Sequence, residues 1–259
     1  MNAFKSESDL CAAFIEALPD GWTSYPETAG FDILLVADDG FQIGIEAKMR
    51  TNAKVISQAV ESLSDCCLPG PDCRAILVPA GKVGSFRGIC RLLAITVIEC
   101  GRREDIWLRN VKPGPWAFMP RLPSETGRNS YSAERDWHQW CPVKRCPVPD
   151  YVPDVVAGVP APLRLTAWKI KAIKILILLE RRGFVTRHDF KALGFDPRRW
   201  IVPAYGWLTT QRRGVYVAGP NLPDLRRAHP TNYPEIEADF EKWAPLDMLT
   251  ETPEERRAP

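Results

Sequence analysis

The stretch FDILLVADDGFQIGIEAKMR, residues 31–50, decides the fold of the first part of this 259-residue chain. Two apolar runs, about 31–36 and 41–48, flank a turn that ends in Gly40, a pattern typical of two paired strands. Three charged residues interrupt these runs: Asp32, Glu46 and Lys48. A hairpin that only fills a core gains nothing from such charges, so they point to a second role.

The turn decides where these charges lie. Alternation along the second strand places Glu46 and Lys48 on one face and their apolar neighbours on the other. A two-residue turn would put Asp32 on the wrong face. A three-residue loop with Gly40 in the left-handed conformation would instead put Asp32 directly opposite Glu46. This second register gathers two carboxylates and one amine into a cluster.

Two carboxylates opposite each other across a sheet repel, so the cluster has a poor structural rationale. A divalent cation removes this objection, because Mg²⁺ takes oxygen ligands and uses one or two carboxylates with water and substrate phosphate. A lysine beside a metal-bound water orients it or helps to deprotonate it, and offsets phosphate charge in the transition state. These are the groups that phosphodiester hydrolysis needs. The alternative is an inert structural ion cluster.

Asp32 on one strand and Glu46-Ala47-Lys48 on the next resemble the signature of the PD-(D/E)XK nuclease superfamily, which includes restriction endonucleases and Holliday-junction resolvases. The resemblance covers roughly residues 6–100. Phe31 stands where the signature often has proline. The resemblance implies a metal-dependent deoxyribonuclease in which Asp32 and Glu46 hold Mg²⁺ and Lys48 assists the attacking water.

The family often carries an acid on its first helix that completes the metal site, and Glu7 and Glu16 are the candidates. Helical spacing places Glu7 on the packed face of a predicted helix, 6–18, and Glu16 on the solvent side, so we choose Glu7. On the next helix, Gln58 resembles a glutamine that faces the site in several branches of the family. An ordinary exposed helix residue is an equally good interpretation of Gln58. Lys54 lies one turn earlier on the same face and is placed to contact phosphate.

Hydrophobic patterns around the hairpin predict an α/β domain over residues 1–112, with a mixed sheet and the order α-β-β-α-β-α-β. This order resembles the restriction-endonuclease-like core. Ser6 is the expected cap of the first helix. Beyond the hairpin, the predicted elements are helices at 6–18, 52–65 and 83–94 and strands at 74–80 and 95–100.

The composition then changes. Ten of the 24 prolines lie in residues 113–162, which we interpret as a connector that partly wraps the first domain. Residues 163–220 predict three helices and a hairpin, the arrangement of a winged helix-turn-helix. Residues 221–259 are an acidic, Pro-rich tail that we expect at the periphery. The helices of the second domain are expected at 166–182, 186–193 and 196–204, and the hairpin at 207–219.

Positive charge is concentrated in one segment. Residues 160–219 carry 12 basic and 3 acidic side chains, a balance of +9 in a chain whose net charge is +2. Such a block either binds phosphate or forms a solvated helix face, and both readings stay open. In a winged helix, residues of the third helix face the major groove and the wing tip reaches phosphate or the minor groove. These candidates are Arg198, Arg199 and Trp200 on the helix, and Arg212 and Arg213 on the wing.

Other signals narrow the class of protein. A composition of 45% hydrophobic and 25% charged residues is typical of a globular protein. No apolar run reaches the ~18 residues of a membrane span. The N-terminus lacks an export signal and the eight cysteines suggest reduced thiols, so we expect a cytoplasmic protein. His138, Cys141 and Cys146 supply only three of the four ligands of a zinc site. The sequence contains no Gly-rich phosphate-binding loop, so we expect no nucleotide cofactor.

These observations predict a Mg²⁺-dependent endonuclease that docks duplex DNA with one domain and cuts it with the other. Mn²⁺ is expected to substitute for Mg²⁺. Enzymes of this kind often form homodimers to cut both strands, but the sequence shows no interface. The main alternative is a non-cleaving DNA-binding or regulatory protein that uses the nuclease-like domain as a scaffold. A nuclease that acts on RNA or on a branched junction is a third reading.

Overall fold

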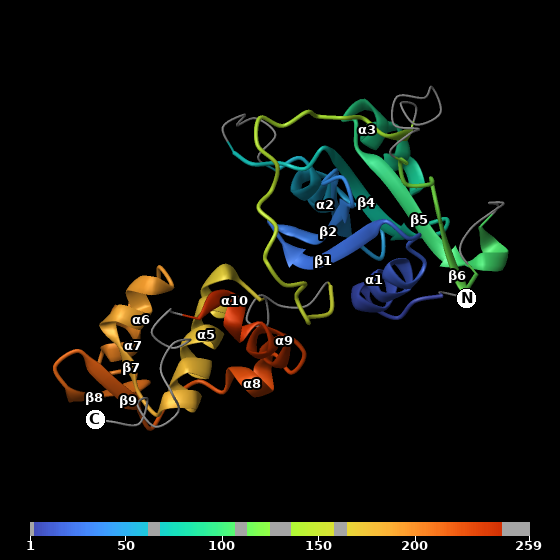
Figure 1. Cartoon of the computed structure of the whole chain (residues 1–259). Coiled ribbons are helices and arrows are strands. Elements are labelled where there is room, and N and C mark those ends of the chain that lie inside the picture. Colours follow the sequence, from blue (N-terminus) through green and yellow to red (C-terminus); the bar gives the residue numbers. More distant parts are fainter. Residues whose placement is uncertain (1–2, 62–67, 107–112, 125–135, 158–164, 245–259) are drawn as a thin grey trace. The chain divides into compact units, whose positions relative to one another are not determined.

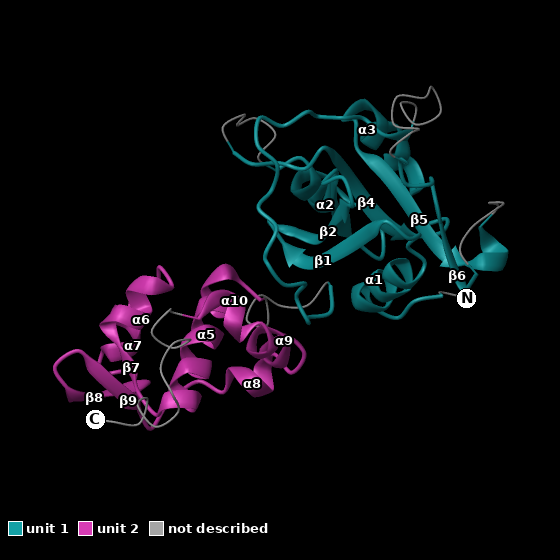
Figure 2. Ribbon diagram, viewed as in Figure 1, with its two compact units in different colours: residues 1–164 teal, residues 165–259 magenta. Residues whose placement is uncertain are grey.

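The structure, a computed structural model, divides into two compact units, residues 1–164 and 165–259 (Figure 2). Each unit is described by itself. The described residues are 3–61, 68–106, 113–124, 136–157 and 165–244.

Unit 1 is built on a six-stranded mixed sheet with the strand order β1-β2-β3-β4-β5-β6 (Figure 1). The two central pairings, β3 with β4 and β4 with β5, are parallel, and the outer pairings are antiparallel. The predicted α/β class is confirmed. The strands are β1 Trp22–Thr28, β2 Phe31–Ala37, β3 Gln42–Ala47, β4 Cys73–Pro79, β5 Thr96–Arg102 and β6 Trp116–Met119.

The hairpin of β2 and β3 has the three-residue loop that brings the acids together. Ile33 pairs with Ile45, and Gly40 closes the loop with a φ of 82°. Continuing this register by one residue places Asp32 opposite Glu46. Left-handed backbone at Gly40 is what a three-residue hairpin loop requires. The second of the two registers considered from the sequence is therefore the correct one.

Both outer strands of the sheet, β1 and β6, are missing from the predicted order. β1 contains Pro26 and mostly polar residues, which suit an edge because proline cannot donate a ladder hydrogen bond. β6 lies inside the Pro-rich segment 113–162 and pairs with β5. That segment therefore completes the sheet, and the sheet extends past the expected limit at residue 112.

The first two helices of unit 1 begin where the sequence predicts, whereas the third begins at Arg87 after a 3₁₀ turn, and the second ends at Ala59, before the predicted end at 65. Ser6 caps α1 in a capping box with Asp9, and the Asn52 side chain caps α2. α1 packs over the sheet face that carries Ile43 and Ile45, and forms the main core with it. Residues 62–67, the end of the predicted helix 52–65, lie outside the described part. The helices are α1 Glu7–Glu16, α2 Ala53–Ala59 and α3 Arg87–Leu92, with short 3₁₀ turns at Gly84–Phe86 and Arg103–Asp105.

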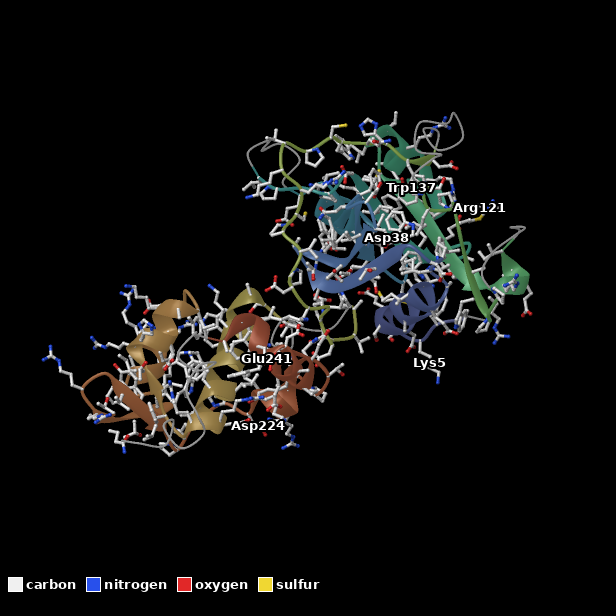
Figure 3. The ribbon with its side chains drawn as sticks, viewed as in Figure 1. Lys5, Asp38, Arg121, Trp137, Asp224 and Glu241 are labelled. Atoms are coloured by element: carbon white, nitrogen blue, oxygen red, sulfur yellow. The ribbon has the colours of Figure 1, made fainter. Side chains whose placement is uncertain are left out.

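The connector segment 136–157 packs onto unit 1. The Trp137 indole is buried in the main core and donates to the Arg121 carbonyl at 2.8 Å (Figure 3). Arg145 forms an ion pair with Asp72 at 2.8 Å. The segment therefore belongs structurally to unit 1, and Trp137 is a core residue.

Phe31 explains the glycine in the middle of β3. A Cβ added at Gly44 would lie 2.6 Å from the Phe31 ring, which itself is buried against Leu34 and Cys146. Gly44→Ala is therefore expected to lower the free energy of unfolding by ~1–3 kcal/mol, measured by urea denaturation. Gly88→Ala is the control, because Gly88 lies in α3 with nothing near its missing Cβ. It should be neutral or slightly stabilising, and equal effects of both variants would contradict this packing.

Unit 2 contains three helices and a small sheet whose first strand, β7, lies between α5 and α6, and then three further short helices. The sheet has the order β7-β9-β8, and the hairpin turns at Gly214, whose φ is 80°. The elements are α5 Ala167–Arg182, β7 Val185–Thr186, α6 Arg187–Ala192, α7 Arg198–Ile201, β8 Leu208–Arg212, β9 Val215–Ala218, α8 Leu225–Ala228, α9 Asn232–Ala238 and α10 Phe240–Trp243.

Most predicted element ends in unit 2 are confirmed. Gly183 ends α5 with a φ of 84°, and Thr186 caps α6 in a capping box with Asp189. α7 is much shorter than the predicted helix 196–204. It stops at Ile201 because the residue before Pro203 takes an extended conformation, as proline imposes on its neighbour.

The acidic segment after residue 220 differs from expectation. α9 packs against α5, and Tyr233 and Ile236 are fully buried. Arg226 bonds to Glu180 of α5 at 2.8 Å. Described residues of this segment therefore supply part of the core of unit 2. In the described chain, no helix is both long and apolar enough to span a membrane.

Candidate functional site

The charged residues of the hairpin lie at one end of the sheet, where β2 starts and β3 ends. The Asp32 carboxylate accepts a hydrogen bond from the Ala47 amide at 2.8 Å. The Lys48 amide donates to the Leu77 carbonyl of β4 at 2.9 Å. Glu46 is only 3% exposed. The backbone of two neighbouring strands therefore fixes the positions of all three predicted residues.

Glu7 joins this group from α1. Its carboxylate accepts a hydrogen bond from Lys48 Nζ at 2.7 Å. Burial works to lower the pKa of Lys48, but the bond to Glu7 and the negative charges of Asp32, Glu7 and Glu46 outweigh it, and the pKa is raised. The ammonium group is therefore charged and held in one direction. In this geometry Glu7 contacts the lysine, and a role as metal ligand stays a prediction.

The electrostatics around Glu46 show a shortage of positive charge. Burial and then the Asp32 carboxylate raise the pKa of Glu46 to about 8, and Lys48 offsets only part of this. The charges of Glu27 and Glu61 contribute smaller parts of the same increase. Two carboxylates so placed cannot both ionise near neutral pH unless another cation is present.

This donor set fits a hard divalent cation. Asp32 and Glu46 supply carboxylate oxygens at one place, and a cation there would relieve their repulsion. Within the described residues, no three or more His, Cys, Asp or Glu side chains gather into a metal-binding group. The protein would therefore offer two carboxylates, which suffices for Mg²⁺ when water and substrate oxygens fill the other positions.

Glu27 is a charged residue of this region that the sequence reasoning missed. It lies on β1, is 7% exposed and has a φ of 52°, which is unusual for a residue other than glycine. Its charge raises the pKa of Glu46 and of the buried Cys11. Its position depends on the edge strand β1, which the sequence did not predict. Nothing in the stretch WTSYPET marks its single acid as a residue near the site.

The two candidates on α2 differ in their surroundings. Gln58 has a buried side-chain oxygen with no hydrogen-bond partner among the described residues, whereas Lys54 is exposed. α2 packs against β3, and Glu61 just beyond its end acts electrostatically on Glu46. The end of α2 therefore lies within electrostatic range of the site.

The DNA-contact candidates of unit 2 are exposed, with one exception. Arg198 forms an ion pair with Asp196 at 2.7 Å and is 86% exposed. Trp200 was expected to face a DNA groove, and this is wrong. It is fully buried and packs against neighbouring aromatic rings. The other exposed candidates are Arg199, Arg212 and Arg213.

The residues considered for zinc have other contacts. The His138 ring packs edge-on against Trp140 at 4.7 Å. The Cys146 amide and carbonyl both bond to the Gln42 side chain, and its thiol is buried. Cys141 is exposed.

Comparisons of the chain with protein-family models, with curated proteins and with solved structures find no match.

Metal-free protein offers a test of the carboxylate pair. A folded pKa of about 8 against the usual 4.5 means that folded Glu46 binds a proton that the unfolded chain releases. Wild-type stability should therefore fall as the pH rises between these two values. In EDTA, Glu46→Gln should match wild type near pH 4 and exceed it by ~2 kcal/mol near pH 9, measured by urea denaturation.

The exposed Glu16 supplies the control, because Glu16→Gln should show no such difference between the two pH values. Adding Mg²⁺ at the higher pH should stabilise wild type and leave Glu46→Gln unchanged. Equal stabilisation of both proteins by Mg²⁺ would remove Glu46 from the set of metal ligands.

Proposed function

We propose that this chain is a metal-dependent endonuclease that resembles the PD-(D/E)XK superfamily. The observation that carries the proposal is the register of the hairpin, which brings Asp32 opposite Glu46 with the charged Lys48 beside them. A purely structural role does not account for two carboxylates at a buried position with too little compensating charge. Phosphodiester hydrolysis uses all three groups.

The surrounding elements support this reading. An α-helix, the acid-bearing strand, the E-x-K strand, a second helix and a parallel strand occur in the order expected of the nuclease core, as α1, β2, β3, α2 and β4. β1 adds to the outer side of β2. The charged residues lie where β3 ends and the chain turns toward α2, the place that the E-x-K pattern occupies in the family it resembles.

Each residue then has a chemical task. Asp32 and Glu46 would hold Mg²⁺, which when bound supplies Lewis-acid polarisation of the phosphate and an acidified water. Lys48, held by Glu7, points a charged ammonium group at the same place and offsets the negative charge that develops on the phosphate oxygens. The raised pKa of Lys48 favours a role as a charged donor that orients the attacking water. Gln58 would supply an amide from α2.

Unit 2 would dock the DNA. Its helices α5, α6 and α7 with the sheet β7-β9-β8 support the winged-helix reading, and the segment has a balance of +9. α7 spans only four residues and Trp200 points inward, so major-groove reading by this helix is weakly supported. Phosphate contacts by exposed arginines are better supported, and binding should weaken steeply with salt.

The test is cleavage of supercoiled plasmid, linear duplex and single strands by the full chain in Mg²⁺, Mn²⁺ or EDTA. Nicked or linear products in either metal, and none in EDTA, are the expected result. DNA binding without cleavage of any substrate would replace the proposal by a non-cleaving DNA-binding protein. The oligomeric state on DNA, measured by light scattering, would show whether a homodimer cuts both strands.

A further inference from the structure

Unit 2 has a groove between α6 and α7 with a volume of about 440 Å³. Three basic side chains line it, and no acidic side chain is among its lining residues. Arg187 is oriented by a hydrogen bond from its Nε to the Tyr216 hydroxyl at 3.0 Å. Arg198 is braced by Asp196, and Lys191 is exposed. The positive charge of the rim therefore comes mainly from Arg187 and Lys191 on α6, and the charge of Arg198 on α7 is offset by Asp196.

The floor of the groove is apolar, and its two aromatic rings are largely covered: Phe190 is fully buried and Phe195 is 7% exposed. The rings of Phe190 and Phe195 are stacked, with centroids 5.9 Å apart and an interplanar angle of 16°. Both also contact the buried Trp200, so the floor is rigidly supported. Pro197 and Ile201 complete it and are partly exposed. An occupant would therefore meet an apolar surface first and a ring of cations around it.

We propose that this groove binds an unpaired nucleotide of a nucleic acid, with the base on the apolar floor and the adjoining phosphates on the basic rim. Unpaired bases offer a flat face to apolar and aromatic side chains, whereas the bases of an intact duplex are stacked inside it. The volume lies in the range of small-molecule sites, which suits one nucleotide.

The charge of the unit favours this occupant over an acidic peptide with an apolar side chain. Arginine matches phosphate in a forked geometry, and two of the three rim cations are arginines. The excess of +9 extends over the whole segment 160–219, as a continuous phosphate backbone requires. The inference rests on the proposed function in taking nucleic acid as the ligand of unit 2. It narrows the substrate class to DNA with a single-stranded extension, flap or gap.

The test measures binding by fluorescence anisotropy in EDTA, where cleavage cannot occur. The full chain is titrated onto a labelled blunt duplex and onto the same duplex with a single-stranded extension. We expect the extension to tighten binding about tenfold, because one stacked base contributes of that order. No gain from the extension would overturn the inference.

Two variants test the groove by different means. Ile201→Asn makes the floor polar without changing charge, and Lys191→Glu reverses one rim charge. Both should abolish the gain from the extension while blunt-duplex binding persists, and thermal unfolding checks that each variant is folded. Lys242→Glu, on exposed α10, is the matched control and should keep the gain. A gain that survives both groove variants would overturn the inference.

A competition experiment distinguishes a nucleic acid from the alternative occupant of the groove, an acidic peptide. An acidic peptide with aromatic residues that binds the groove, while no oligonucleotide does, would assign it to a protein ligand and overturn the proposal. Failure of the proposed catalysis is distinguishable, because an extension-dependent gain without any cleavage would leave the groove assignment standing.

Discussion

Replacing Lys48 by methionine is expected to reduce metal-dependent plasmid cleavage about 10²–10³-fold, because the variant loses a charged donor aimed at the reacting phosphate. The Lys48 ammonium is fixed by Glu7 at 2.7 Å, and its pKa is raised, so it is charged at any pH at which the enzyme would be assayed. Methionine keeps the unbranched stem of the side chain and removes the ammonium group, with its charge and its N–H donors. The measurement is the initial rate of nicking in Mg²⁺.

The control for this loss is Lys82→Met, since Lys82 is an exposed lysine of the same unit. Its cleavage rate should stay within twofold or so of wild type, as surface substitutions usually do. DNA affinity in EDTA should be unchanged in Lys48→Met, which separates catalysis from docking. Cleavage by Lys48→Met at close to the wild-type rate would remove the hairpin from the proposed active site.

Glu7 is expected to act through Lys48, so Glu7→Gln should lower the rate less than Lys48→Met does. An amide oxygen still accepts a hydrogen bond from the ammonium group but no longer carries a charge. If Glu7 instead binds the metal, the loss should be partly reversed by raising the Mg²⁺ concentration. The Mg²⁺ dependence of the rate thus decides between the two roles of Glu7.

Replacing Arg182 by methionine is expected to destabilise unit 2 by ~3–5 kcal/mol, because it leaves a buried carboxylate without its cation. Asp189 is fully buried and bonds to Arg182 and to the Thr186 amide and hydroxyl. The capping box of α6 depends on the same carboxylate. Hydrogen–deuterium exchange with mass spectrometry would follow unit 2 separately from unit 1.

Arg198→Met is the matched control, since it breaks an arginine–aspartate pair in the same unit at an exposed position. It should leave the exchange of unit 2 nearly unchanged, because exposed ion pairs contribute little to stability. Protection of unit 2 in Arg182→Met equal to that of wild type would show that the buried pair does not hold α5 and α6 together. Reduced protection confined to unit 2 is the expected outcome.

The candidate site in unit 1 could be predicted because its signals are local. Gly40 allowed both a two-residue and a three-residue turn, so the sequence reduced the register to two choices, and the three-residue loop brings Asp32 opposite Glu46. Helix caps such as Ser6 and Thr186 are equally local, since side chain and backbone partner lie within one turn. These predictions required no knowledge of distant contacts.

The features that the sequence did not predict depend on contacts between elements that are distant in the sequence. β1 is a strand only because β2 offers it an edge, and its polar residues with Pro26 gave no pattern of their own. Because β1 was not predicted, Glu27 was not identified as a charged residue near the site. Trp200 points inward because neighbouring aromatic rings from other elements close around it, and helical spacing within four residues does not show this.

The bond from the Lys48 amide to the Leu77 carbonyl sets the order in which a competent protein can appear during synthesis. β4, which supplies that carbonyl, is made about thirty residues after the hairpin, and the hairpin alone holds two acids that repel each other. A growing chain that ends before β4 therefore carries the charged residues without the neighbour that fixes them. Assembly of the site therefore coincides with completion of the parallel part of the sheet.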